Sequence, residues 1–164
     1  MASAPRCATS ELHIWLKHTG AALGTVGGYL AFTNRGTTAC SLTGWPSLTA
    51  FRQGASTTAI HVRETMFGPW LWVKGLERPV RGVPIVILKP GRSAVAAFTA
   101  GDHSGKRSGA CPAPYRQLRV TPPGSSTSTV ISAWLGGGYR VFLPSCTGIY
   151  LSMVVPASAL SHLG

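Results

Sequence analysis

The sequence has 164 residues, of which 45% are hydrophobic and 12% are charged. A chain of this length is best explained as one domain with an ordinary apolar core, and the low charged fraction excludes a polyampholytic disordered protein. The formal net charge is +11, because 15 Lys and Arg outnumber the acids Glu11, Glu64, Glu77 and Asp102. The basic residues are scattered over the whole length. They attract polyanions, although a solvated basic surface without a dedicated partner is the simpler alternative.

Turn-forming residues punctuate the chain at short intervals and separate runs with strand character. Leu12, Ile14 and Leu16 alternate with polar residues and predict a first strand with one apolar face. Lys89-Pro90-Gly91 predicts a tight turn between two later strands. The candidate runs are 12–16, 28–33, 41–46, 48–51, 60–63, 84–88, 93–99, 117–121, 127–135, 139–143 and 149–155. We therefore expect an all-β domain of about eight to ten short strands, with no helix of useful length.

The four cysteines are Cys7, Cys40, Cys111 and Cys146. None belongs to a C-x-x-C pair, which argues against zinc-finger and thioredoxin-type sites. An even count in a β-rich chain favours two disulfides, for which three pairings are possible. Disulfides persist in oxidising compartments, so we expect the mature protein outside the cytoplasm. No run approaches the roughly 18 apolar residues of a transmembrane segment, no signal peptide is visible, and Met1 to Ala4 resemble a start placed before an already trimmed chain.

Several motifs follow one another in an order that is typical of one family. Thr33-Asn34-Arg35-Gly36 precedes Cys40-Ser41-Leu42-Thr43-Gly44-Trp45-Pro46, then come Leu88-Lys89-Pro90-Gly91-Arg92-Ser93-Ala94, Cys111-Pro112 and Leu118-Arg119-Val120-Thr121-Pro122-Pro123-Gly124. Together they resemble the motifs N-x-G, C-x-L-x-G-[YW]-P, L-x-P-G-x-S-A, C-P and L-R-V-T-P-P-G of domain of unknown function 4232, a family of secreted actinobacterial proteins. The resemblance runs from Cys7 to about Pro156, and Cys146 falls at the family's last cysteine.

The resemblance implies an exported, immunoglobulin-like antiparallel β-sandwich that is tethered to the cell envelope or released from it. It transfers no catalytic residue to this chain. The expected organisation is a single domain over residues 1–164, with a family-like core at 7–156 and an aromatic insertion at 64–82. We predict the disulfides Cys7–Cys40 and Cys111–Cys146, each closing a loop of roughly 35 residues and contributing about 3–4 kcal/mol in the chain-entropy model.

Residue combinations that carry catalysis or bind metals are scarce. The sequence contains no G-x-S-x-G motif and no G-x-x-x-x-G-K-[ST] phosphate loop, and only two of its four acids share a segment. The histidines are His13, His18, His61, His103 and His162. They form no H-x-H or H-x-x-x-H pair of the kind that binds metals. We therefore expect no enzymatic activity, no cofactor and no metal.

The segment around Met66 to Gly75 is the most distinctive part of the sequence. Trp70 and Trp72 alternate, so an extended backbone places both rings on one face. The candidate binding residues are Phe67, Trp70 and Trp72 together with Arg63, Lys74, Arg78 and Arg81. Aromatic rings beside cations can stack on sugars or bases while the cations hold anionic groups. The competing interpretation, which we favour, is that the tryptophans cap one end of the core.

Two functional hypotheses follow. The first is a non-catalytic exported interaction module of the cell envelope or extracellular space, whose partner is an unidentified protein. The second is a basic envelope protein whose surface charge binds anionic glycopolymers, lipid headgroups or nucleic acid. The two differ in salt dependence, since polyanion binding weakens steeply with salt and an aromatic-centred protein contact does not.

The two interpretations of the tryptophans predict opposite results for Trp70→Ala combined with Trp72→Ala. If 64–82 is a recognition loop, the double variant loses its partner and keeps its melting temperature. If the rings cap the core, it loses about 3–5 kcal/mol per buried ring and unfolds. Thermal melts beside a partner pull-down distinguish these outcomes, and a double variant that unfolds or keeps every partner rejects the loop as the recognition element.

Overall fold

A computed structural model of the chain describes residues 3–22, 24–52, 62–65, 83–101, 111, 113–135, 142–146 and 148–160. Within these ranges the regular structure consists of eleven strands and two short 3₁₀ helices, so the prediction of an all-β chain is confirmed. The strands are β1 (Leu12–Ala22), β2 (Thr25–Asn34), β3 (Cys40–Thr43), β4 (Ser47–Arg52), β5 (Val62–Thr65), β6 (Ile85–Leu88), β7 (Ser93–Gly101), β8 (Tyr115–Thr121), β9 (Thr129–Ser132), β10 (Ile149–Ser152) and β11 (Val155–Pro156). The 3₁₀ helices are η1 (Thr9–Glu11) and η2 (Ala157–Leu160).

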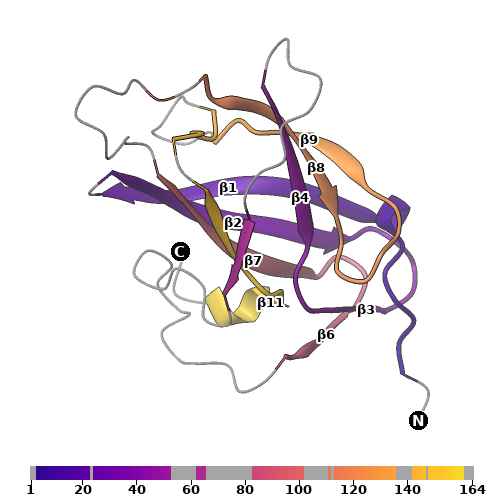
Figure 1. The fold of residues 1–164 in the computed structure, drawn as a ribbon. Helices are drawn as coiled ribbons and strands as arrows, with labels where there is room; N and C mark the ends of the chain where they lie inside the picture. Colours follow the sequence, from indigo (N-terminus) through magenta and orange to yellow (C-terminus); the bar gives the residue numbers. More distant parts are fainter. Residues whose placement is uncertain are drawn as a thin grey trace.

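These strands form three sheets. The largest has the order β1-β2-β7-β10-β5, with β11 also pairing with β7, while β3-β6 and β4-β8-β9 form the other two. Every described strand pair is antiparallel except β5 with β10. In Figure 1 the β4-β8-β9 sheet crosses the β1-β2-β7 sheet at a steep angle, and β3 and β6 lie at the end of the molecule near the N-terminus.

The main core lies between the sheets and draws side chains from all three. Leu12 and Ile14 of β1 are buried and His13 is exposed, as the alternation in the sequence predicted. Phe32 and Phe98 from the largest sheet, Leu42 from β3 and Leu118 from β8 belong to the same buried cluster. Each strand therefore turns one face inward, and burying this apolar surface is the main favourable term for folding.

The middle of the largest sheet is covered on both faces. All residues of β7 from Ala94 to Ala100 are buried, although a strand with one solvated face would alternate. A second buried cluster lies on the face away from the main core, where Tyr29 and Val95 pack with Val155 of β11 and with Trp15. The many alanines of β7 fit this position, because small side chains allow layers to pack closely on both sides.

The turn between β6 and β7 has the geometry that its sequence predicted. Pro90 follows Lys89, and Gly91 adopts φ 79°, a left-handed conformation that favours glycine. The Arg92 N–H donates to the Lys89 carbonyl at 3.0 Å and closes the turn. Pro at the second position and Gly at the third are the residues that a type II turn requires.

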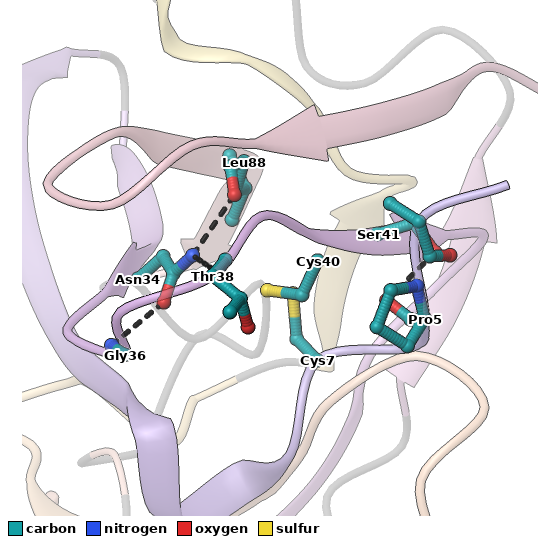
Figure 2. The surroundings of a disulfide bond; sticks show 9 residues. Pro5, Cys7, Asn34, Gly36, Thr38, Cys40, Ser41 and Leu88 are labelled. Atoms are coloured by element: carbon teal, nitrogen blue, oxygen red, sulfur yellow. Dashed lines mark hydrogen bonds between the residues drawn. A yellow bond between two sulfur atoms is a disulfide. The ribbon is translucent and has the colours of Figure 1, made fainter. Parts of the chain in front are cut away.

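Asn34 joins this turn to two other segments (Figure 2). Its side chain is 1% exposed, its amide nitrogen donates to the Thr38 and Leu88 carbonyls at 2.9 Å each, and its amide oxygen accepts from the Gly36 N–H at 2.8 Å. Its backbone N–H donates to the Arg92 carbonyl, and its own carbonyl accepts from the Gly91 N–H. All the polar groups of this buried residue thus have partners, as burial requires.

The N-terminal segment lies along β3 and contacts the loop after β8. The Cys7 N–H donates to the Ser41 carbonyl, and the Ser41 N–H donates to the Pro5 carbonyl. Arg6 donates to the carbonyl of Gly124, where φ is 70°. Cys7 and Cys40 form one disulfide beside the Asn34 junction, as Figure 2 shows, and Cys111 and Cys146 form the other. This is the pairing that we predicted from the sequence.

Removal of the Asn34 side chain is expected to be severely destabilising. Asn34→Ala leaves two carbonyls and one N–H without their partner, at about 1–3 kcal/mol for each buried group that stays unsatisfied. Asn34→Asp keeps the shape of the side chain but replaces both donors by an acceptor, so a similar loss is expected at neutral pH. Thr37→Ala, in the same loop but exposed, serves as the control and should stay within about 0.5 kcal/mol of the wild type. Urea denaturation measures both, and equal stabilities would contradict this role of Asn34.

The two disulfides should differ in their rate of reduction. Cys7 and Cys40 are buried, whereas Cys111 and Cys146 are partly exposed, and a reductant must reach a sulfur atom to attack it. Limited reduction with an alkylating agent present should therefore label Cys111 and Cys146 first. Peptide mapping by mass spectrometry measures the order, and early labelling of Cys7, or a Cys7–Cys111 peptide without reductant, would contradict the assignment.

Candidate functional site

The aromatic loop predicted from the sequence falls almost entirely outside the described residues. Phe67, Trp70, Trp72, Lys74, Arg78 and Arg81 lie outside them. Arg63 belongs to β5, where its backbone pairs with Tyr150 of β10, but its side chain is not among those described. The proposal that 64–82 binds a partner therefore stays a prediction.

A second combination of aromatic and cationic residues lies on the outer face of the β4-β8-β9 sheet. In β8, Leu118 and Val120 are buried in the core, and Gln117 and Arg119 point to the opposite side and are exposed. The register places Thr49 of β4, Arg119 of β8 and Val130 of β9 in one row across the sheet. Phe51, Gln117 and Ser132 form the adjacent row.

A bulge in β8 brings a second arginine to this side. Phe51 pairs with Gln117 but Arg52 pairs with Tyr115, so Arg116 is an extra residue in the ladder. As a result Arg116 and Gln117 are both exposed, although they are neighbours in a strand. Bulges redirect side chains in this manner and are common beside functional sites.

Each of the two arginines stacks on an aromatic ring. The Arg119 guanidinium carbon lies 5.1 Å from the centre of the Phe51 ring, and that of Arg116 lies 4.1 Å from the centre of the Phe142 ring. Phe142 in turn contacts Trp134 edge to face, with ring centres 4.9 Å apart. Stacking on a ring holds a guanidinium in place while its N–H groups stay directed outward. We call Phe51, Arg116, Arg119, Val130, Trp134 and Phe142 the cation–aromatic face.

The cation–aromatic face is open to solvent, and no acidic side chain that the structure describes lies on it. Val130 is 48% exposed and Trp134 is 40% exposed, so two large apolar side chains face solvent beside the two arginines. Glu11, the one acid whose side chain the structure describes, lies elsewhere, beside Gly36 in the loop after β2. With about 4.8 Å between strands and about 3.3 Å per residue, the face measures roughly 10 Å across the three strands and roughly 13 Å from Val130 to Trp134.

This geometry is chemically suited to binding anionic groups and sugars. Guanidinium groups hold phosphate, sulfate or carboxylate groups through paired hydrogen bonds, and an exposed indole can stack on a sugar ring. No group of three or more potential metal ligands occurs among the side chains that the structure describes. The described part of the chain also contains no helix that is long and apolar enough to cross a membrane.

Comparison with known families assigns the chain to one of them. The model described as Domain of unknown function (DUF4232) matches residues 7–143, which is most of the chain. The chain belongs to this family. The match begins at Cys7, as expected, and ends 13 residues before the expected limit at Pro156. No protein of curated function matches the sequence.

The family motifs and the cation–aromatic face occupy different parts of the structure. The motif residues Asn34, Cys40 and Leu88 meet at the junction in Figure 2, and Gly91 donates its backbone N–H to the Asn34 carbonyl there. Of the face residues, Arg119 alone belongs to a motif. The sequence analysis missed this face because it searched for aromatic and basic residues close together along the chain. Alternation in Gln117-Leu118-Arg119-Val120 and in Ala133-Trp134-Leu135 was the available signal, but the bulge at Arg116 left no trace in the sequence.

Proposed function

We propose that this protein is a non-catalytic, exported binding domain that holds an anionic polysaccharide on its cation–aromatic face. The observation that supports this most directly is the pair of stacked arginines, Arg116 on Phe142 and Arg119 on Phe51, on one exposed sheet face. Two cations at fixed positions can contact successive anionic groups of a polymer. Trp134, which lies beyond Arg116 at the end of the face, can stack on a sugar next to them. A flat face suits an extended polymer better than a small molecule, which needs a concave site.

The exported location and the detailed fold are part of the same proposal. Two disulfides are consistent with an oxidising compartment. Sheets that pack their apolar faces around one core, with long-range pairing between distant strands, support an immunoglobulin-like sandwich. In such a domain the outer face of a sheet is free for a ligand, because only the inner face is needed for the core.

The net charge of +11 strengthens binding at every basic surface, so the proposal requires a test that separates the face from the total charge. Arg116→Gln combined with Arg119→Gln removes two charges from the face. Arg35→Gln combined with Lys89→Gln removes two charges from exposed positions elsewhere and is the matched control. Both variants have the same net charge, and both replace exposed side chains that the core does not need.

Affinity for a heparin oligosaccharide, measured by calorimetry at several salt concentrations, is the readout. We expect the face variant to bind at least about tenfold more weakly, and the slope of log affinity against log salt to fall by about two. The control should retain most of its affinity at the same salt concentration. Equal losses in the two variants would show that total charge alone drives binding, and tighter binding to single-stranded DNA or anionic vesicles than to heparin would assign a different ligand class.

A further inference from the structure

The free edge of β6 is a second unusual surface, and it lies in a different sheet from the cation–aromatic face. Among the described strands, β6 pairs with β3 alone, on one side. Its burial alternates: Val86 and Leu88 belong to the core, while Ile85 is 69% and Ile87 is 50% exposed. Exposed edge strands are usually protected by being very short, by lysines or by proline, because their free backbone groups recruit other strands. β6 has only 4 residues and lies between Pro84 and Lys89, but the strand itself shows two isoleucines to solvent.

The register determines which backbone groups of β6 point to the free edge. Ser41 lies opposite Ile87 in the β3-β6 pair, but its N–H and carbonyl bond to Pro5 and Cys7 on the far side of β3. Ser41 and Ile87 are therefore a non-hydrogen-bonded pair, and the N–H and carbonyl of Ile87 point away from β3. By the same alternation those of Ile85 also point to the free edge. Among the described residues, none bonds to these four groups.

A groove runs beside this edge. Val86, Ile87 and Leu88 form one wall, the turn from Gly91 to Ser93 closes one end, and residues 156–158 form the opposite wall. Its volume of about 500 Å³ lies within the range of natural ligand sites. The groove thus combines the outward backbone groups of Ile87, the apolar side chains beside them, and one cation, Arg92, while Ile85 continues the edge beyond the groove.

The positive charge at the end of β6 distinguishes between the molecules that could occupy the groove. Lys89 and Arg92, both exposed, stand at the end of β6 where the groove is closed. A second copy of this chain would bring a net charge of +11 and its own Lys89 and Arg92 to the same edge, which repels it. An acidic segment of another protein is attracted instead. The unpaired N–H and carbonyl groups require an occupant with an extended backbone, because only a strand presents matching groups at the same spacing.

We propose that β6 accepts an extended, acidic peptide segment of a partner protein, which adds a strand to the β3-β6 sheet along Ile85 and Ile87. Alternate apolar side chains of the segment pack on these two isoleucines, and its carboxylates lie near Lys89 and Arg92. This site is independent of the polysaccharide face, since the two share no residue.

The test uses two synthetic peptides, acetyl-Val-Thr-Val-Thr-Val-Asp-Glu-amide and acetyl-Glu-Asp-Val-Thr-Val-Thr-Val-amide, which place the acids at either end. NMR titration of the wild-type protein should show saturable shifts of the Ile85 and Ile87 amides with at least one of them. Each peptide is also made in two N-methylated forms, one methylated at the odd-numbered and one at the even-numbered backbone nitrogens. One form should bind at least about tenfold more weakly than the unmethylated peptide and the other nearly as well, because only every second N–H faces β6. This comparison leaves the protein unchanged and so avoids effects on its folding.

Two protein variants complete the test. Arg92→Gln should weaken binding of the acidic peptide and not of its Asn-Gln analogue, whereas Arg116→Gln, on the polysaccharide face, should alter neither. The proposal is wrong if neither acidic peptide shifts the Ile85 and Ile87 amide signals at millimolar concentration. It is also wrong if N-methylation at the odd and at the even positions weakens binding equally. It is also wrong if hydrogen exchange finds the Ile85 and Ile87 amides already protected in the free protein, which would show that this chain or a second copy already covers the edge; sedimentation distinguishes those two occupants.

Discussion

The arrangement of the sheets depends on the five hydrogen bonds of one buried residue, Asn34. The largest sheet contains β2 and the smallest contains β3 and β6, and Asn34 stands where the chain leaves the first for the second. Its side chain binds the carbonyls of Thr38 and Leu88, while its backbone binds the turn at Gly91 and Arg92. An isolated amide in an apolar environment costs several kcal/mol, so this residue is tolerated only where all its partners are in place. The junction therefore selects one arrangement of the sheets.

The family motifs at the junction and the cation–aromatic face lie in different parts of the structure. The motif residues at the junction are used in holding β2, β3 and the β6-β7 turn together, with the Cys7–Cys40 disulfide beside them. The cation–aromatic face places its solvent-exposed side chains on the outer face of the β4-β8-β9 sheet, away from that junction, whereas the β6 edge adjoins the junction at Leu88 and Arg92. A shared scaffold of this kind can carry different ligand specificities, because outward-facing residues vary without changing the core.

Local sequence patterns predicted those parts of the fold that depend on interactions between residues close together in the sequence. The alternation of Leu12 and Ile14 and the Pro90-Gly91 turn have local causes, and both are found in the structure. The run Ile85 to Leu88 is apolar throughout, so its pattern could not reveal which isoleucines face solvent; that depends on which side packs against the core. The parallel pairing of β5 with β10 joins residues far apart in sequence and had no local signal either. Likewise Arg116 reaches the outer face only because the β4-β8 ladder contains a bulge.

We propose that the junction around Asn34 holds the fold and that the outer face of the β4-β8-β9 sheet binds an anionic polysaccharide. A single NMR titration with a heparin oligosaccharide tests both halves, when it follows the arginine Nε–H, tryptophan indole and asparagine side-chain amide signals together. We expect saturable shifts of the Arg116 and Arg119 Nε–H signals and of the Trp134 indole signal. The Asn34 side-chain amide signals should not move, and their protons should exchange slowly with solvent. Uniform small shifts of all arginines, or rapid exchange of the Asn34 amide protons in the free protein, would contradict it.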